Sequence, residues 1–146
     1  MFRGDVKVNF GNKMTILATE TPPYNLSWPT EEGALYLIHL FDPDVPSKLN
    51  RSLGEYRHWT VGNIPGSDVS KGYVLAEYTG ILRNHSRGQL HRYVFIAYKQ
   101  PGHEPLEFDD YVIKKTDDYL LRAGFSHRYF AREHRLGDPH AINFFH

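Results

Sequence analysis

Two carboxylates and two histidines stand at the ends of apolar runs, and side chains of these types can hold an anion or a metal. Asp42 and Asp44 alternate with prolines, whereas His58 and His91 lie in later apolar segments and Tyr93 follows the second of them. Imidazole and phenol groups donate hydrogen bonds to phosphate oxygens, and a carboxylate can orient a histidine and fix its tautomer. These residues are therefore candidates for an anion pocket.

Other hypotheses are open for the same residues. Two histidines and one carboxylate are the ligands of open non-haem iron sites, so Asp42, His58 and His91 could also serve a metal-dependent hydrolase. Asp and Pro are ordinary turn residues, so Asp42 and Asp44 could simply form a turn. The chain has no cysteine and no Gly-x-Ser-x-Gly or Gly-rich phosphate motif, so we expect no catalysis, no bound metal and no cofactor.

Three long segments must position these side chains. Residues 34–41 form a nearly unbroken apolar run, typical of a strand buried on both faces, and the prolines after it end the strand. Two acids at the mouth of a buried strand need partners, which we expect from residues 55–59 and 90–93. Strand alternation over 55–63 predicts Tyr56, His58 and Thr60 on one face and Arg57, Trp59 and Val61 on the other.

The remaining pattern predicts a mainly β domain. Further strands are expected at residues 6–10, 14–17, 24–28, 72–78, 90–100 and 141–145. A short helical turn is expected at 117–122, and a helix at 126–136 with Ser126 as its N-cap and Gly137 at its stop. Many short strands without regular β-α alternation favour a two-sheet antiparallel β-sandwich with one or two short helices, as a single domain over residues 1–146.

Composition limits the partners. Seventeen basic residues balance seventeen acidic ones, so no global field attracts nucleic acid, and none is expected as a partner. No apolar run approaches the roughly 20 residues that a transmembrane helix needs. Three Asn-x-Ser sequons, at Asn25, Asn50 and Asn84, are compatible with secretion.

The chain resembles the phosphatidylethanolamine-binding proteins, also known as Raf kinase inhibitor proteins, in four motifs that keep the family's order and spacing. They are Asp42-Pro43-Asp44-Val45-Pro46-Ser47, Tyr56-Arg57-His58-Trp59, Asn63-Ile64-Pro65-Gly66 and Gly88-Gln89-Leu90-His91-Arg92-Tyr93-Val94-Phe95. The resemblance covers most of the chain, from about residue 6 to the end.

The resemblance implies a β-sandwich with a small anion pocket at one end, and it implies a role for each matched residue. The pocket residues match Asp42, His58, His91 and Tyr93, with Pro43, Asp44 and Pro46 shaping the wall, Tyr56 in an aromatic position, and Gly80 starting a loop whose backbone often completes the site. Family members bind phosphate-containing head groups without known catalysis of their own, and various members inhibit kinases or serine proteases. We therefore expect a non-enzymatic, monomeric protein that takes a phosphorylated small molecule or phospholipid head group, with a kinase or protease as its protein partner.

The chain departs from the family pattern in places. The loop at residues 80–87 has no proline and two arginines, and the chain is short at both ends relative to the family. A mitochondrial-ribosome component shares this fold, so a structural subunit with a vestigial pocket is the alternative. Retention of both Asp42 and Asp44 favours a working pocket. A cytoplasmic location is expected, with secretion or mitochondria as alternatives.

Overall fold

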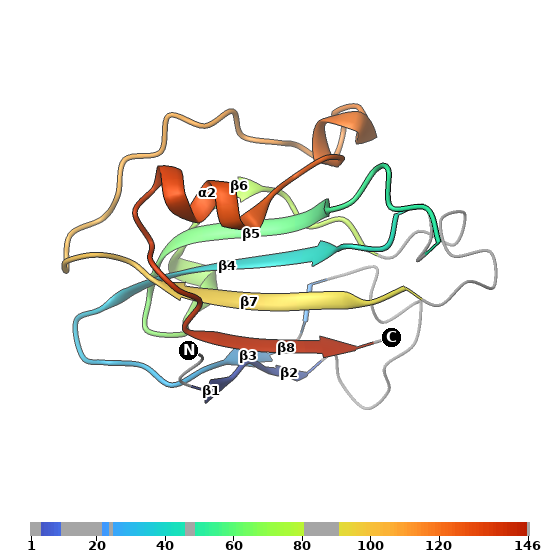
Figure 1. Ribbon diagram of the computed structural model, residues 1–146. Helices are drawn as coiled ribbons and strands as arrows, with labels where there is room; N and C mark the ends of the chain where they lie inside the picture. The colour runs from blue at the N-terminus through green and yellow to red at the C-terminus, as the bar shows by residue number, and fades with distance from the viewer. Residues whose placement is uncertain (1–3, 10–21, 24, 46–48, 81–90, 146) are drawn as a thin grey trace.

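The computed structural model describes residues 4–9, 22–23, 25–45, 49–80 and 91–145. Its centre is a six-stranded sheet with the order β1-β8-β7-β4-β5-β6 (Figure 1). The strands are β1 (Gly4–Asp5), β4 (Leu35–Asp42), β5 (Tyr56–Pro65), β6 (Tyr73–Ala76), β7 (Tyr93–Lys99) and β8 (Ala141–Phe145). The predicted mainly β fold is confirmed, but the sheet is not wholly antiparallel, because β1 pairs in parallel with β8.

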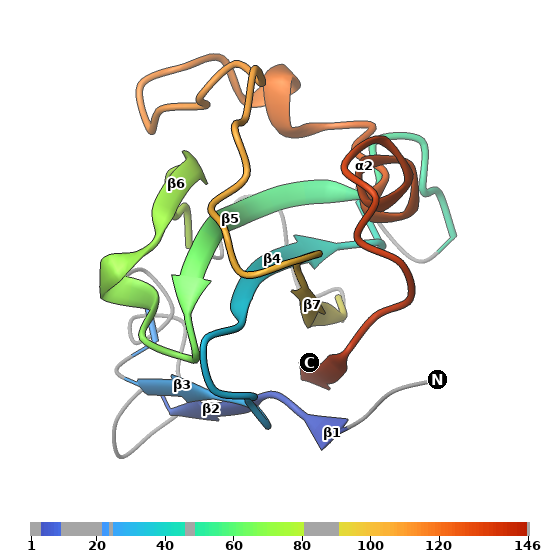
Figure 2. The ribbon, with the colours of Figure 1, turned by 90° about the vertical axis from the view of Figure 1, so that its left-hand side faces the viewer.

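A small second sheet lies on one face of the large one. It pairs β2 (Lys7–Asn9) with β3 (Asn25–Ser27), and Figure 2 shows it on the side of the large sheet opposite the helix α2. Buried side chains from both sheets form one core cluster, which includes Leu26, Tyr36, Ile38, Trp59 and Phe95. The predicted strand at 14–17 lies outside the described residues.

The other face of the sheet is covered by helix α2 (His127–Glu133). Phe130 and Ala131 pack there against Leu37, Phe41 and Ile96 in a second core cluster. The Ser126 side chain accepts a hydrogen bond from the Tyr129 backbone and caps the helix, as predicted. The helix ends earlier than expected, however, because Arg135 already has a left-handed backbone with a φ of 55°.

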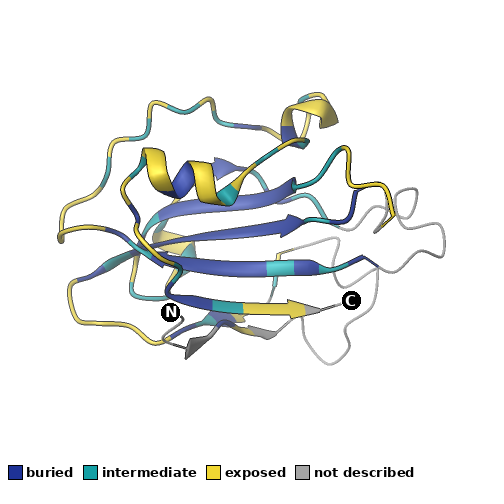
Figure 3. Cartoon of the chain, viewed as in Figure 1, coloured by how far each residue is buried: buried dark blue, intermediate teal, exposed yellow. Residues whose placement is uncertain are grey.

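Two short 3₁₀ helices complete the described elements. They are η2 (Val69–Lys71), in the connection between β5 and β6, and η3 (Tyr119–Arg122), at the predicted helical turn. Nothing in the described part of the chain is a helix long and apolar enough to cross a bilayer. Burial follows the layers, since β4 and most of β5 are buried along their length (Figure 3).

A β-bulge in β5 overturns the predicted alternation of its side chains. Leu40 of β4 pairs with Trp59, but the next residue, Phe41, pairs with Arg57, so His58 is the extra residue of the bulge. Arg57 consequently shares the α2 face with Thr60, to whose hydroxyl its Nε donates at 2.7 Å. Trp59 instead lies in the core cluster between the two sheets.

Candidate functional site

A buried hydrogen bond joins Asp42 and His91 at the end of β4. The His91 Nδ1 lies 2.7 Å from the Asp42 Oδ2, and each residue is only 2% exposed. The other oxygen of Asp42 accepts the backbone N–H of Asp44 at 2.7 Å, so Asp42 also builds the turn that the alternative hypothesis expected. Burial, as the largest effect, raises the pKa of the Asp42 carboxyl, while the hydrogen bonds from Asp44 and His91 oppose the shift.

Asp44 forms hydrogen bonds with the segment that leads into β7, and these bonds attach the turn after β4 to that segment. Its carboxylate accepts the Arg92 backbone N–H at 2.9 Å and the Arg92 guanidinium at 2.9 and 2.8 Å. The Arg51 Nε lies 3.4 Å away as a second cation. The side-chain hydrogen bond from Arg92 holds the pKa of the Asp44 carboxyl below its ordinary value. The segment 90–93 therefore supplies the expected partners of both acids, His91 for Asp42 and Arg92 for Asp44. Asp44 holds the turn in place.

His58 reaches the same region because the bulge turns its ring out of the regular alternation. Its Nδ1 lies 2.8 Å from the carbonyl oxygen of Thr79, and because a carbonyl only accepts, Nδ1 carries the proton of this hydrogen bond. Arg122 supports the bulge from behind, since its Nη1 donates to the carbonyl oxygens of Arg57 and His58 at 3.1 and 3.2 Å.

Tyr93 joins the two histidines into one cluster of four aromatic rings. The ring centroids of Tyr56 and His58 lie 5.0 Å apart, those of His58 and Tyr93 5.8 Å, and those of His91 and Tyr93 6.3 Å. With Asp42, these side chains are 2–5% exposed. Burial raises the pKa of both the Tyr56 and the Tyr93 phenol, so each keeps its proton at neutral pH and can donate it to an acceptor.

One nitrogen of the cluster lacks a partner among the described residues. The His91 Nε2 is buried and makes no hydrogen bond with them. A buried polar atom without a partner costs free energy, so it needs a ligand or water group at that position. We call Asp42, Tyr56, His58, His91 and Tyr93 the anion cluster.

The other residues expected at the site have separate positions. Pro43 is half-buried and packs tightly against Gly54, where an added Cβ would lie 2.5 Å from the Pro43 carbonyl oxygen. Gly80 is half-buried, whereas Pro46 and the loop at 81–90 lie outside the described residues, so their contribution stays a prediction. Within the described part, no three His, Asp or Glu side chains are grouped so as to hold a metal ion, which gives the hydrolase hypothesis no geometric support.

Sequence reasoning expected Arg92 near the two acids, as part of residues 90–93, but missed Arg122. Arg122 carried no such signal, since its partners are backbone carbonyls 64 and 65 residues away in the chain.

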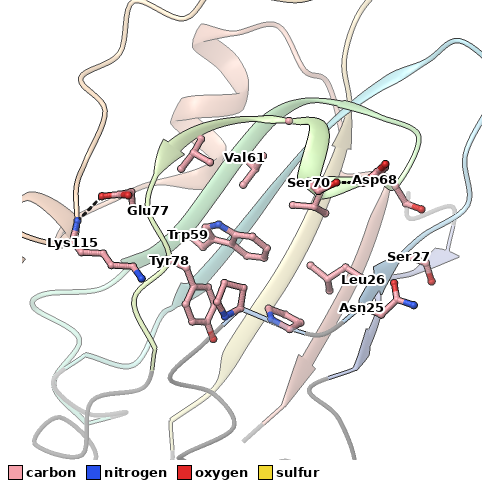
Figure 4. A pocket seen from close by; sticks show the side chains of 16 residues that line it. Asn25, Leu26, Ser27, Trp59, Val61, Asp68, Ser70, Glu77, Tyr78 and Lys115 are labelled. Atoms are coloured by element: carbon pink, nitrogen blue, oxygen red, sulfur yellow. Dashed lines mark hydrogen bonds between the residues drawn. The ribbon is translucent and has the colours of Figure 1, made fainter.

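Another cavity lies away from the anion cluster. A hollow of about 710 Å³ opens between the two sheets, beside Leu26, Trp59, Val61 and Tyr78 (Figure 4). None of the residues predicted for the anion site lines it, so it is a separate feature of the fold.

Comparison with known proteins assigns the chain to a family. Residues 6–145 match the model of the family described as "Phosphatidylethanolamine-binding protein". The chain belongs to the phosphatidylethanolamine-binding protein family.

One curated relative matches nearly the whole chain. A "26 kDa secreted antigen" of Toxocara canis is 34% identical over 146 residues, which are 99% of this chain and 53% of the relative, so the chain spans about half that protein's length.

Solved structures share the fold. One is carboxypeptidase Y inhibitor, complexed with its cognate proteinase, with a TM-score of 0.73, 20% identity, and coverage of 99% of this chain and 82% of that one. Another is a phosphatidylethanolamine-binding protein from Plasmodium falciparum, with a TM-score of 0.59, 22% identity, and coverage of 94% and 76%.

Proposed function

We propose that this domain is a non-enzymatic binding protein whose anion cluster takes the phosphate of a head group such as phosphoethanolamine. The observation that carries the proposal is the buried His91 Nε2, which makes no hydrogen bond with the described residues. A phosphate oxygen within reach would supply the missing acceptor and gain a charge-assisted bond.

The contacts of the two histidines define how they would bind an anion. The Asp42 carboxylate accepts a hydrogen bond from the His91 Nδ1, and the Thr79 carbonyl oxygen accepts one from the His58 Nδ1. Each ring can then donate from Nε2 only as the imidazolium. The hydrogen bond to Asp42 orients the His91 ring, and the Tyr93 phenol adds a neutral donor. The cluster is therefore suited to a compact oxyanion rather than to a neutral ligand.

The test is calorimetric titration of phosphorylethanolamine into the wild-type protein and into His91→Ala. Loss of a charge-assisted hydrogen bond should cost about 1.5–3 kcal/mol, or roughly a ten- to hundredfold loss of affinity. His127→Ala is the matched control, because His127 pairs with Glu55 outside the anion cluster, and its affinity should equal that of the wild type. Equal affinities for all three proteins would mean that this protein does not bind the head group at His91.

A proteinase is the partner class that we propose for the surface of the protein. Its support is the similarity in fold to an inhibitor solved together with its cognate proteinase. Inhibition assays against serine carboxypeptidases and endopeptidases test the proposal, with the His91→Ala protein included to show whether the anion cluster takes part. Full proteinase activity at a large excess of the domain would contradict it.

We also propose secretion in place of the cytoplasmic location expected from the sequence. The support is the relative of 34% identity that is described as a secreted antigen, together with the sequons noted above.

A further inference from the structure

A groove runs between helix α2 and the uncovered part of the large sheet. It has a volume of about 670 Å³, and its floor is apolar, with Phe41, Val94, Ile96 and Ile142 from β4, β7 and β8. Figure 1 shows α2 lying over the β5 side of the sheet, so that β7 and β8 are left beside it. None of the residues of the anion cluster lines this groove.

The floor continues to the edge of the sheet as exposed apolar surface. Val94 is half-buried and pairs across the strands with Phe144, whose side chain is 58% exposed. Figure 3 shows the exposed end of β8 beside the buried part of β7. Apolar side chains in this position gain stability when another apolar surface covers them.

The wall of the groove is basic. Arg128 and Arg132 project from α2, and Arg135 follows in the left-handed turn after it; all three are exposed and line the groove. No carboxylate among the described residues forms an ion pair with any of the three. Asp138 is the acidic residue among those that line the groove.

The spacing of these cations selects the form of the ligand. Arg128 and Arg132 stand four positions apart in α2, the spacing of one helical face, and lie ~6 Å apart along its axis at about 1.5 Å per residue. Arg135 adds a third cation in the turn beyond the helix. A small anion can meet one or two of these cations, whereas a helix with acidic residues along one flank can meet all three while its apolar face covers Val94, Ile142 and Phe144.

We propose that this α2 groove is a docking site for an acidic amphipathic helix of a partner protein, separate from the anion cluster. The apolar floor provides the contact area, and Arg128, Arg132 and Arg135 set the charge and register of the partner. A binding surface of this kind would let the domain hold a protein partner and a head group at the same time.

Fluorescence anisotropy with a designed labelled peptide tests the proposal. The probe is a 16-residue helix with Leu on one face and Glu along its flank, and its control replaces every Glu by Gln. We expect the Glu peptide to bind, the Gln peptide to bind at least tenfold more weakly, and added salt to weaken only the Glu peptide.

Variants of the protein test whether the peptide binds in the α2 groove. Replacing Arg128, Arg132 and Arg135 together by Gln should weaken the Glu peptide about tenfold or more, and Phe144→Ala should weaken both peptides. The charge-matched control replaces Lys71, Lys114 and Lys115, which are exposed and outside the groove, and should change affinity less than twofold. Equal loss in the two triple variants would overturn the proposal, because it would show attraction to overall charge.

A second outcome would also overturn it. If sedimentation shows that the wild type dimerises and the arginine variant does not, a second copy of this chain occupies the groove instead. Titration of phosphorylethanolamine into the arginine variant separates this proposal from the proposed head-group binding. The variant should bind phosphorylethanolamine as tightly as the wild type does, whatever the result of the peptide experiment.

Discussion

Asp42 and Asp44 stand two residues apart, yet their surroundings give the two carboxyl groups opposite properties. Asp42 is buried against one histidine and a backbone N–H, and burial raises its pKa. Asp44 is equally buried but accepts three hydrogen bonds from Arg92, which lower its pKa. The neighbouring Arg92 cation therefore explains why Asp44 has the lower pKa of the two carboxyl groups.

The Asp44 contacts predict a pH-dependent loss of stability in Asp44→Asn. A carboxyl whose pKa is lowered on folding adds stability above its unfolded pKa of about 3.9, and that stability is lost as the pH falls through the lower folded value. We expect the variant to be about 1.5–3 kcal/mol less stable at pH 7. Urea unfolding from pH 7 down to pH 3 should show the gap closing at the acid end; a constant gap would contradict an electrostatic origin.

Binding at the anion cluster should weaken as the pH rises. An anion within hydrogen-bond distance favours the imidazolium, and histidine side chains ordinarily titrate near pH ~6.5. Calorimetry with phosphorylethanolamine between pH 5.5 and 8.5 should show affinity falling with pH in the wild type. His91→Ala should show a shallower fall, since one of the two imidazoles is gone. A pH-independent affinity would mean that neutral donors alone hold the ligand.

At the scale of the elements, the bulge in β5 shows what the sequence could and could not specify. Apolar runs, prolines and the Ser126 cap located most strands and α2, because these signals are local. The bulge at His58 depends on the register between β4 and β5, in which Phe41 pairs with Arg57 and Leu40 with Trp59. Simple alternation therefore separated Arg57 from Thr60 and grouped it with Trp59 and Val61, which lie together in the core between the sheets.

The residues of the candidate site were predictable from the sequence, but their pairing was not. The motifs indicated which residues belong together, and His91 and Arg92 were expected near the acids. The pairing of Asp42 with His91 and of Asp44 with Arg92 could not be predicted, because it depends on how the β4 turn meets the start of β7. Arg122 was missed because its contacts are made to backbone atoms.

Arg122 should link the stability of the bulge to ligand binding. Arg122→Met keeps the length and burial of the side chain but leaves the carbonyl oxygens of Arg57 and His58 without their donor. We expect a loss of about 1–3 kcal/mol in unfolding free energy and weaker binding of phosphorylethanolamine through displacement of His58. Lys114→Met, at an exposed position, is the control and should change neither quantity. Full head-group affinity in the Arg122 variant would show that the bulge holds His58 without it.

At the scale of the whole molecule, the two proposed sites use different parts of one sheet. The anion cluster lies where β4 ends and β7 begins, whereas the α2 groove lies along the face of β7 and β8. Val94 and Tyr93 are neighbours in β7 but belong to opposite faces, Tyr93 to the core cluster between the sheets and Val94 to the one under α2. Ligands at the two sites therefore need not compete.

The proposed secretion can be tested on the surface of the molecule at Asn50. Its sequon, Asn50-Arg51-Ser52, forms an exposed turn in which the Asn50 side chain accepts the Ser52 backbone N–H at 3.1 Å, so the folded protein has room for a glycan there. Glycans are attached to such sequons in secreted proteins. We therefore expect peptide mass spectrometry of the protein from its natural source to show Asn50 modified. In a eukaryotic secretion host, Asn50→Gln and Ser52→Ala should each remove the same glycan mass, because either change destroys the sequon. Unmodified Asn50 in the natural protein, together with efficient modification in the secretion host, would place the protein outside the secretory pathway and restore the cytoplasmic assignment.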